Sequence, residues 1–241
     1  MIRFLFFLSC FLSVNATAQE APQVKTLPLP KSDYTRFEAQ EGSFSAFVQD
    51  LPVQKGQYVA SVRGRIFCPD MLAKVNIPLL FPDRDLEQCA DWAMRLWADY
   101  HRQKQRLSDL YLFNYGGEKQ YFKAQQRSFA SFLKWAFAYS NSYSLKQGTI
   151  PIREDELRPG DLLVQNETGG IGHVSVILDQ CQNTEGATRY RVGFSFMPAQ
   201  EMRILEAPAR YGTDGWYTLD GIRAHLKADY FDIPVVLRRF E

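Results

Sequence analysis

The spacing of apolar residues changes near residue 150, and this change limits the folds that the chain can adopt. Up to that point, apolar residues recur mainly at the three- and four-residue spacing of amphipathic helices. Beyond it, short β-favouring runs alternate with turn residues, as in a meander of antiparallel strands. The runs are 161–164, 173–178, 190–196 and 202–205, and the turns are 158–160, 167–170 and 183–186. This order favours an α+β fold in which helices precede an antiparallel sheet.

The longest helical pattern lies in the first half of the chain. Apolar residues recur on one face from residue 86 to residue 100, and acidic residues at 83 and 85 could cap the helix, so the pattern predicts a helix that runs to about Lys104. Shorter patterns predict helices at 43–51, 128–137 and 220–227, and strands at 58–67, 110–113 and 235–240. No repeat or linker divides residues 42–241, so we expect one domain there.

The N-terminus has the pattern of a secretory signal peptide. Residues 1–18 contain one basic residue, Arg3, then a short apolar run and the small-residue ending Ala16-Thr17-Ala18. An alternative is a lipoprotein anchor on Cys10. Residues 19–41 are polar and proline-containing, which indicates an extended lead-in. No later stretch is apolar for the length of a membrane helix, so we expect a mature protein in the periplasm or outside the cell.

Charge and cysteine content narrow the classes of partner. The 28 basic and 27 acidic residues nearly balance, which argues against nucleic acid or anionic lipid as the main partner. Loss of Cys10 with the signal peptide leaves Cys68, Cys89 and Cys181, an odd number. In an oxidising compartment at least one thiol then stays unpaired or bridges to another molecule. A Cys68–Cys181 bridge would leave Cys89 free, but the sequence does not fix the pairing, and all could be small buried hydrophobic residues.

Cys89 and His173 form the main candidate for chemistry. A thiol attacks as a thiolate, and the first turn of a helix favours the thiolate through its partial positive charge and free N–H groups. A neighbouring imidazole would act as base and then acid. The backbone N–H of Cys89, with its neighbour Gln88, could stabilise an oxyanion. The competing interpretation is that Cys89 is a buried helix residue and His173 a hydrogen-bonded residue at the end of a strand.

His173 stands out among the three histidines. His101 and His225 lie in polar, surface-like helical segments, whereas His173 follows a glycine-rich turn and opens an apolar run. A third polar group normally orients the imidazole, and the next strand offers Ser195, with Gln200 just beyond it. Asp91 is expected to point elsewhere, because two residues along a helix turn a side chain away from Cys89.

Other kinds of site have weak support. The histidines and cysteines lack the spacing of a zinc site, and the glycines at 169–172 do not open a helix, so they do not form a phosphate loop. We therefore expect neither a metal nor a cofactor.

Three motifs follow one another along the chain: Cys89 opens a helix, residues 158–164 read Arg-Pro-Gly-Asp followed by an apolar run, and Gly172-His173 opens the next strand. This order resembles that of papain-like cell-wall peptidases and amidases of the NlpC and CHAP kinds. The resemblance implies a papain-like fold with Cys89 as nucleophile, His173 as base and a polar residue on the following strand as its orienting partner. The interval between Cys89 and His173 is long for those enzymes, and no histidine, asparagine or acid clearly follows.

A second set of motifs extends over most of residues 19–241: 85–91, 95–96, 144–145, 160–161, 172–173, 197–200 and 216–217. In these residues the chain resembles a secreted bacterial family known as domain of unknown function 4846, whose name assigns no activity.

These observations predict a secreted cysteine hydrolase that cleaves amide bonds, with peptide or peptidoglycan-like substrates. One alternative is a non-catalytic envelope or carbohydrate-binding module on the same fold, with Tyr190, Trp216 and Tyr217 as contacts. Another is a transglutaminase-like acyl transferase, although that class usually has an acid on the strand after the histidine. The sequence leaves the substrate and the oligomeric state open.

Overall fold

The computed structural model describes residues 21–241 of the chain. The predicted signal peptide at 1–18 lies outside the described residues, as do the first two residues of the predicted lead-in. Within residues 21–241, no helix is both long and apolar enough to cross a membrane.

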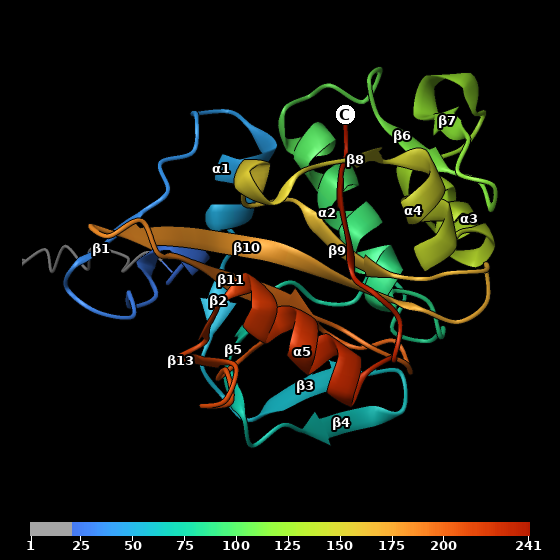
Figure 1. The fold of residues 1–241 in the computed structure, drawn as a ribbon. Helices are drawn as coiled ribbons and strands as arrows, with labels where there is room; N and C mark the ends of the chain where they lie inside the picture. Colours follow the sequence, from blue (N-terminus) through green and yellow to red (C-terminus); the bar gives the residue numbers. More distant parts are fainter. Residues whose placement is uncertain (1–20) are drawn as a thin grey trace, which may run out of the picture.

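A large antiparallel sheet organises the described part of the chain (Figure 1). Its main path runs β2 (Val53–Gln54), β5 (Met71–Val75), β12 (Arg203–Leu205), β11 (Thr188–Phe194), β10 (His173–Asn183), β9 (Leu162–Gln165), β15 (Val236–Arg239) and β8 (Ile150–Pro151). β1 (Tyr34–Arg36) also pairs with β10, and β14 (Trp216–Tyr217) joins β11 to β13 (Gly212–Thr213). Two separate hairpins pair β3 (Tyr58–Ser61) with β4 (Gly64–Phe67), and β6 (Tyr111–Phe113) with β7 (Lys119–Tyr121).

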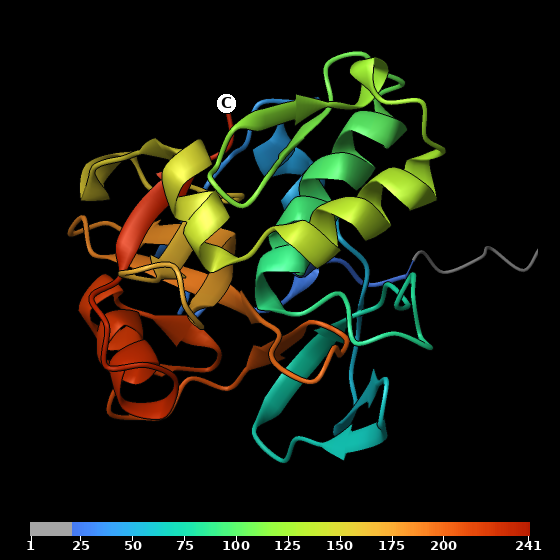
Figure 2. The same cartoon turned by 90° about the vertical axis from the view of Figure 1, so that its right-hand side faces the viewer.

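Helices cover both faces of the sheet. α1 (Phe44–Gln49), α2 (Cys89–Gln103), α3 (Phe129–Tyr139) and α4 (Ser142–Gly148) lie on one side of β10, and α5 (Leu219–Asp229) lies on the other (Figure 1). α3 runs beside α2 (Figure 2). Short 3-10 helices occur at η1 (Val24–Thr26), η2 (Phe122–Ala124) and η3 (Glu154–Glu156). The prediction of an α+β fold with an antiparallel sheet is confirmed.

Strand β10 separates two hydrophobic cores because its side chains alternate between the faces of the sheet. Val174, Val176 and Leu178 belong to the core that contains α2, whereas Ile177 packs in the core that contains α5. The near-complete burial of α2, from Cys89 to His101, shows that this helix is the centre of the first core. α2 therefore packs on the strand that begins at His173, as the sequence predicted.

The start of α2 differs from the prediction. Residues 83 and 85 do not cap the helix, which begins at Cys89 with Gln88 as its N-cap. The preceding residue, Glu87, has a left-handed backbone (φ 69), which cannot continue a helix. Its buried carboxylate accepts hydrogen bonds from the N–H groups of Leu80 (2.5 Å) and Phe81 (2.9 Å), so residues 80–87 fold into a loop.

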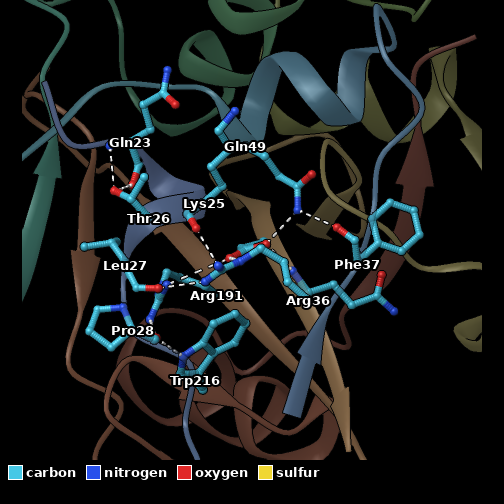
Figure 3. Close-up of polar contacts among 12 residues, drawn as sticks. Gln23, Lys25, Thr26, Leu27, Pro28, Arg36, Phe37, Gln49, Arg191 and Trp216 are labelled. Atoms are coloured by element: carbon cyan, nitrogen blue, oxygen red, sulfur yellow. Dashed lines mark hydrogen bonds and ion pairs between the residues drawn. The ribbon is translucent and has the colours of Figure 1, made fainter. Parts of the chain in front are cut away.

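The predicted lead-in is part of the sheet rather than a bare extended segment. β1 pairs with the far end of β10, with Tyr34 opposite Asn183. Arg36 contacts the buried Asp179 (Nε to Oδ2, 2.8 Å) and also donates to the carbonyl oxygen of Leu27 (2.7 Å), as Figure 3 shows for Arg36 and Leu27. These contacts fix the N-terminal segment to the strand that carries His173 at its other end.

The three cysteines of the described residues are free and buried. Cys68 packs with Val59 and Met71, whereas Cys181 packs with Tyr34 and Trp216 in a different cluster. The Cys68–Cys181 pairing that the sequence left open is therefore not formed.

Candidate functional site

A cavity of about 530 Å³ opens at the N-terminus of α2. Four segments surround it: the start of α2, the α3–α4 junction, the β9–β10 loop and the segment after β11. Its lining residues are Asp85, Leu86, Gln88, Cys89, Ala90, Asp91, Phe137, Ala138, Ser140, Asn141, Ser142, Gly169, Gly170, Ile171, Gly172, Phe196 and Met197. Cys89 is thus in the wall of a cavity large enough for a small ligand.

Local hydrogen bonds and an ion pair fix the position of Cys89. The carboxylate of Asp91 accepts the N–H of Gln88 at 3.0 Å, which caps the first turn of α2. Glu87 pairs with Arg95, about two turns further along the helix (Oε1 to Nη1, 2.6 Å). The loop and the first two turns of the helix are therefore held as one unit, with the thiol at its tip.

The Cys89 thiol is nearly buried and lies against the start of β10. Its Sγ is 4.0 Å from the carbonyl oxygen of Gly172, and 7% of the residue is exposed. Burial raises the pKa of the thiol to about 11, and the negative charge of Asp91 adds to this rise. The N–H of Val174 is the largest influence in the opposite direction. In this arrangement the thiol is protonated at neutral pH.

His173 is at the start of β10, but its ring is fully buried on the α5 side. The imidazole stacks on Tyr230 at 4.3 Å between ring centroids, and its Nε2 lies 2.9 Å from the hydroxyl of Ser175. Nδ1 is buried without a hydrogen-bond partner. Burial lowers the pKa of His173 to about 3, so the ring is neutral.

Within residues 21–241, no hydrogen bond joins Cys89 to His173. The thiol contacts the carbonyl group just before His173, while the imidazole faces the core on the other side of the strand. The structure thus brings the two residues to the same end of β10 without joining their side chains.

The two predicted orienting residues contact other groups. The hydroxyl of Ser195 donates to the backbone oxygen of Gln200 (3.0 Å). The side chain of Gln200 donates to the Pro198 carbonyl (3.1 Å) and accepts from Arg203 (2.7 Å). The partner found for His173 is Ser175, which the sequence analysis missed. The alternation of a strand could have found it, since residues i and i+2 share a face.

The predicted oxyanion donor Gln88 and the excluded Asp91 both line the cavity. The side-chain amide of Gln88 donates to Asp85 at 3.1 Å, so one of its N–H groups is already used. Asp91, expected to point away from Cys89, lines the cavity because the first turn of α2 is the cavity wall, and its carboxylate turns back onto the N–H of Gln88. Its Oδ1 is buried without a partner, and burial raises the pKa of this carboxyl well above its usual range.

The aromatic residues proposed as ligand contacts are core residues. Trp216 and Tyr217 are completely buried, Tyr190 is 5% exposed, and none of them lines the cavity. The indole N–H of Trp216 donates to the Pro28 carbonyl at 3.0 Å, a contact visible in Figure 3. Their aromatic rings stabilise the sheet, and a ligand in the cavity at Cys89 would not reach them.

The two other histidines are buried, contrary to their surface-like sequence context. His101 is 4% exposed and its Nδ1 lies 3.2 Å from the carbonyl oxygen of Arg106. His225 is 5% exposed and its Nε2 lies 3.1 Å from a carboxylate oxygen of Asp229. Across residues 21–241, no group of three or more histidine, cysteine or acidic side chains is arranged to hold a metal ion.

Comparison with known proteins gives one match. Residues 114–235 match the model of a family described as domain of unknown function (4846). No curated protein and no solved structure matches the chain. The matched region contains His173 and the glycine-rich wall of the cavity, whereas Cys89 lies before it.

Proposed function

The chain belongs to the family of domain of unknown function (4846), and we propose that it is a cysteine-dependent hydrolase that cleaves amide bonds in peptides. The observation that carries the proposal is the position of Cys89. Its thiol is at the N-terminus of a helix, in the wall of a cavity, and 4.0 Å from the carbonyl group that precedes the best candidate base. A helix start, a thiol and a space for substrate are the first requirements of a cysteine nucleophile.

The reaction would proceed in two stages. The imidazole of His173 accepts the proton of Cys89, the thiolate adds to the amide carbonyl carbon, and the C–N bond breaks as the imidazolium protonates the leaving amine. Water then adds to the thioester while His173 takes its proton, and the C–S bond breaks to release the acid and restore the thiol. The N–H of Cys89 would donate to the oxyanion in both stages.

The proposal requires a rearrangement at the start of β10. A thiol with a pKa of about 11 and an imidazole with a pKa of about 3 are both uncharged, so they describe a resting state. For catalysis His173 must leave Tyr230 and Ser175 and turn towards Cys89. Contact between the two would favour the thiolate–imidazolium pair, because each charge stabilises the other.

The fold and the location belong to the same proposal. A nucleophile on a helix followed by a base at the start of an antiparallel strand is the arrangement of papain-like enzymes, and here α2 packs on β10 in that order. The predicted leader at residues 1–18 favours a site of action in the periplasm or outside the cell, where peptidoglycan peptides are available substrates.

The direct test is turnover of peptidoglycan-derived peptides, followed by mass spectrometry for new amine and acid ends. The wild-type protein should cleave them, and Cys89→Ala and His173→Ala should lose at least a hundredfold in rate. Cys181→Ala is a matched control, because that thiol is also buried and free but packs near Trp216. Equal cleavage by wild type and Cys89→Ala would exclude the proposal.

A non-catalytic binding module is the second candidate, and the buried, neutral His173 favours it. Such a module would bind peptide in the cavity and never form a thioester. Treatment of the wild-type protein with iodoacetamide at graded pH separates the two. If Cys89 reacts no faster than a model thiol near neutral pH, even with peptide present, the binding module is the better description.

A further inference from the structure

The loop between β9 and β10 forms one wall of the cavity, and three of its backbone N–H groups have no hydrogen-bond partner among the described residues. Gly170, Ile171 and Gly172 all line the cavity. Their N–H groups donate to no other described residue, although they lie between two paired strands of the sheet. An N–H group in a cavity wall is a ready donor for the backbone of a bound chain.

Asn166, at the start of this loop, holds it in shape. Its side-chain oxygen accepts the N–H of Gly169 at 2.9 Å, and its amide nitrogen donates to Ser142 (2.8 Å) and to the carbonyl oxygen of Gly170 (2.8 Å). The residue is only 2% exposed. Three hydrogen bonds from one buried amide make the loop a preformed surface, so a ligand does not have to order it first.

A further contact keeps the loop close to the β6–β7 hairpin, and a glycine lets it pass close to β9. The hydroxyl of Tyr115 donates to the carbonyl oxygen of Gly169 at 2.9 Å. At Gly172 a Cβ atom would lie 2.2 Å from the carbonyl oxygen of Gln165, so a side chain cannot be accommodated there. The glycine permits this close approach and leaves the Gly172 carbonyl beside the thiol of Cys89.

Exposed apolar side chains stand at the same cavity. Ile171 is 69% exposed and Met197, from the segment after β11, is 38% exposed. Both line the cavity together with Phe196. Large apolar side chains gathered around a cavity favour a ligand that brings apolar side chains of its own.

We propose that Gly170–Gly172 is a backbone-recognition edge, which binds an extended peptide through its carbonyl groups while Ile171 and Met197 receive an apolar side chain. Asn166 is the positioning residue of this edge. The proposal rests on the proposed function in one respect, since a peptide on this edge would have an amide bond beside Cys89. The edge specifies which features of the substrate are recognised. These are the main chain of the peptide and an apolar residue next to the bond that is cleaved.

The test uses Cys89→Ala protein, which cannot form a thioester, and the peptide N-acetyl-Ala-Leu-Ala-amide. Titration followed by amide NMR should shift the resonances of Gly170, Ile171 and Gly172 more than those of the distant β3–β4 hairpin. Replacing Leu with Ser in the peptide should weaken binding about tenfold, because the apolar contact is lost. Absence of shifts at the three amides at millimolar peptide would overturn the proposal.

A pair of variants at one position separates backbone from side chain. Ile171→Pro removes the N–H, and Ile171→Ala keeps it while shortening the side chain. In the Cys89→Ala background, Ile171→Pro should weaken peptide binding at least threefold more than Ile171→Ala does. Equal affinities would overturn the backbone role. Asn166→Ala should weaken binding and Asn166→Gln should not restore it, whereas Leu145→Met, in the core, should leave the affinity unchanged.

The outcomes distinguish this edge from the proposed function. If the peptide shifts the three amide resonances but the wild-type protein does not cleave it, the recognition edge is supported and the proposed hydrolase activity is excluded. If the wild-type protein cleaves the peptide but these amide resonances do not shift, the hydrolase activity is supported and the recognition edge is excluded.

Discussion

The two ends of strand β10 bury polar groups in different ways. At the far end, the carboxylate of Asp179 accepts hydrogen bonds from Arg36 and Gln49, both at 2.8 Å. Arg191 lies close to the same carboxylate (Nη1 to Oδ2, 3.9 Å), and Figure 3 shows its side chain beside those of Arg36 and Gln49. At the near end, Nδ1 of His173 and Oδ1 of Asp91 are buried with neither a hydrogen-bond partner nor an ion pair among the described residues. At the far end Nε and Nη1 of Arg191 also lack hydrogen bonds, but this guanidinium is paired with the Asp179 carboxylate.

The difference separates a structural cluster from a candidate site. A buried polar group without a hydrogen bond costs about 1 to 3 kcal/mol, so a fold retains few of them. Around Asp179 the polar partners hold the N-terminal segment on the sheet. Around Asp91 and His173 no ion pair compensates the buried polar atoms, which leaves hydrogen bonds for a ligand or for a moving imidazole to supply. The following predictions test this contrast.

Removal of the carboxylate at the far end should have the largest effect on stability. Asp179→Ala leaves Arg36 and the fully buried Arg191 without their shared partner, so we expect a loss of about 3 to 5 kcal/mol in the free energy of unfolding. Urea unfolding measures it. Asp155→Ala, which breaks an exposed pair with Arg153, should change stability far less, because water screens that pair. A similar loss in both variants would contradict the contrast.

Acid should destabilise the protein because the buried His173, at the near end of β10, resists protonation in the folded state. The pKa of His173 is about 3 in the folded protein, against about 6.5 for an unfolded histidine. Above pH 6.5 this histidine is neutral in both states. Between pH 6.5 and about 3 only the unfolded state takes up the proton, so stability falls on the order of 4 kcal/mol across that window.

Unfolding free energies measured at successive pH values check this prediction. His173→Gln should flatten the slope in that window. His101→Gln should leave the His173 contribution in place. An unchanged slope in His173→Gln would show that the imidazole is solvated in the folded protein.

Tyr230→Ala tests whether the ring that stacks on His173 keeps it uncharged. Loss of the stacked ring should admit water and raise the pKa of His173 by about one unit or more, as NMR titration of the imidazole would show. Under the proposed function, Cys89 should then react faster with iodoacetamide near neutral pH. Tyr139→Ala, on the exposed end of α3, is the control and should alter neither quantity.

The smallest effect is expected at Ser175. Ser175→Ala removes the hydroxyl that contacts Nε2 of His173, and we expect a loss of about 1 kcal/mol in stability. Urea unfolding can resolve a change of this size. If the imidazole must leave Ser175 for catalysis, the turnover rate should rise or stay constant in this variant, and a large loss of turnover would contradict the rearrangement.

Local patterns predicted the layout of the fold but not the long-range contacts. The periodicity located α2 and the apolar runs of β9, β10 and β11, because burial of one face imposes a regular spacing. It placed β10 at 173–178, whereas the strand continues to Asn183, since its polar second half is stabilised by pairing with β1. No pattern of residues within the lead-in predicts a strand that pairs with β10.

The candidate site was predictable in its position and not in its geometry. Cys89 and His173 were located because each opens an element next to a recognisable signal. The face on which His173 lies depends on strand register and on Tyr230, which arrives from the end of α5. Asn166 was missed, since an asparagine in a polar turn gives no sign that its side chain is buried.

The attachment of β1 has a consequence for the order of assembly. Arg36 and Asp179 are separated by 143 residues, so a ribosome makes the first strand long before its partner exists. The β1 segment therefore stays unpaired until the chain has been synthesised beyond β10. Closure of so large a loop is slow compared with the formation of local helices. Chains that end before β10 should keep this segment accessible to proteases or chaperones.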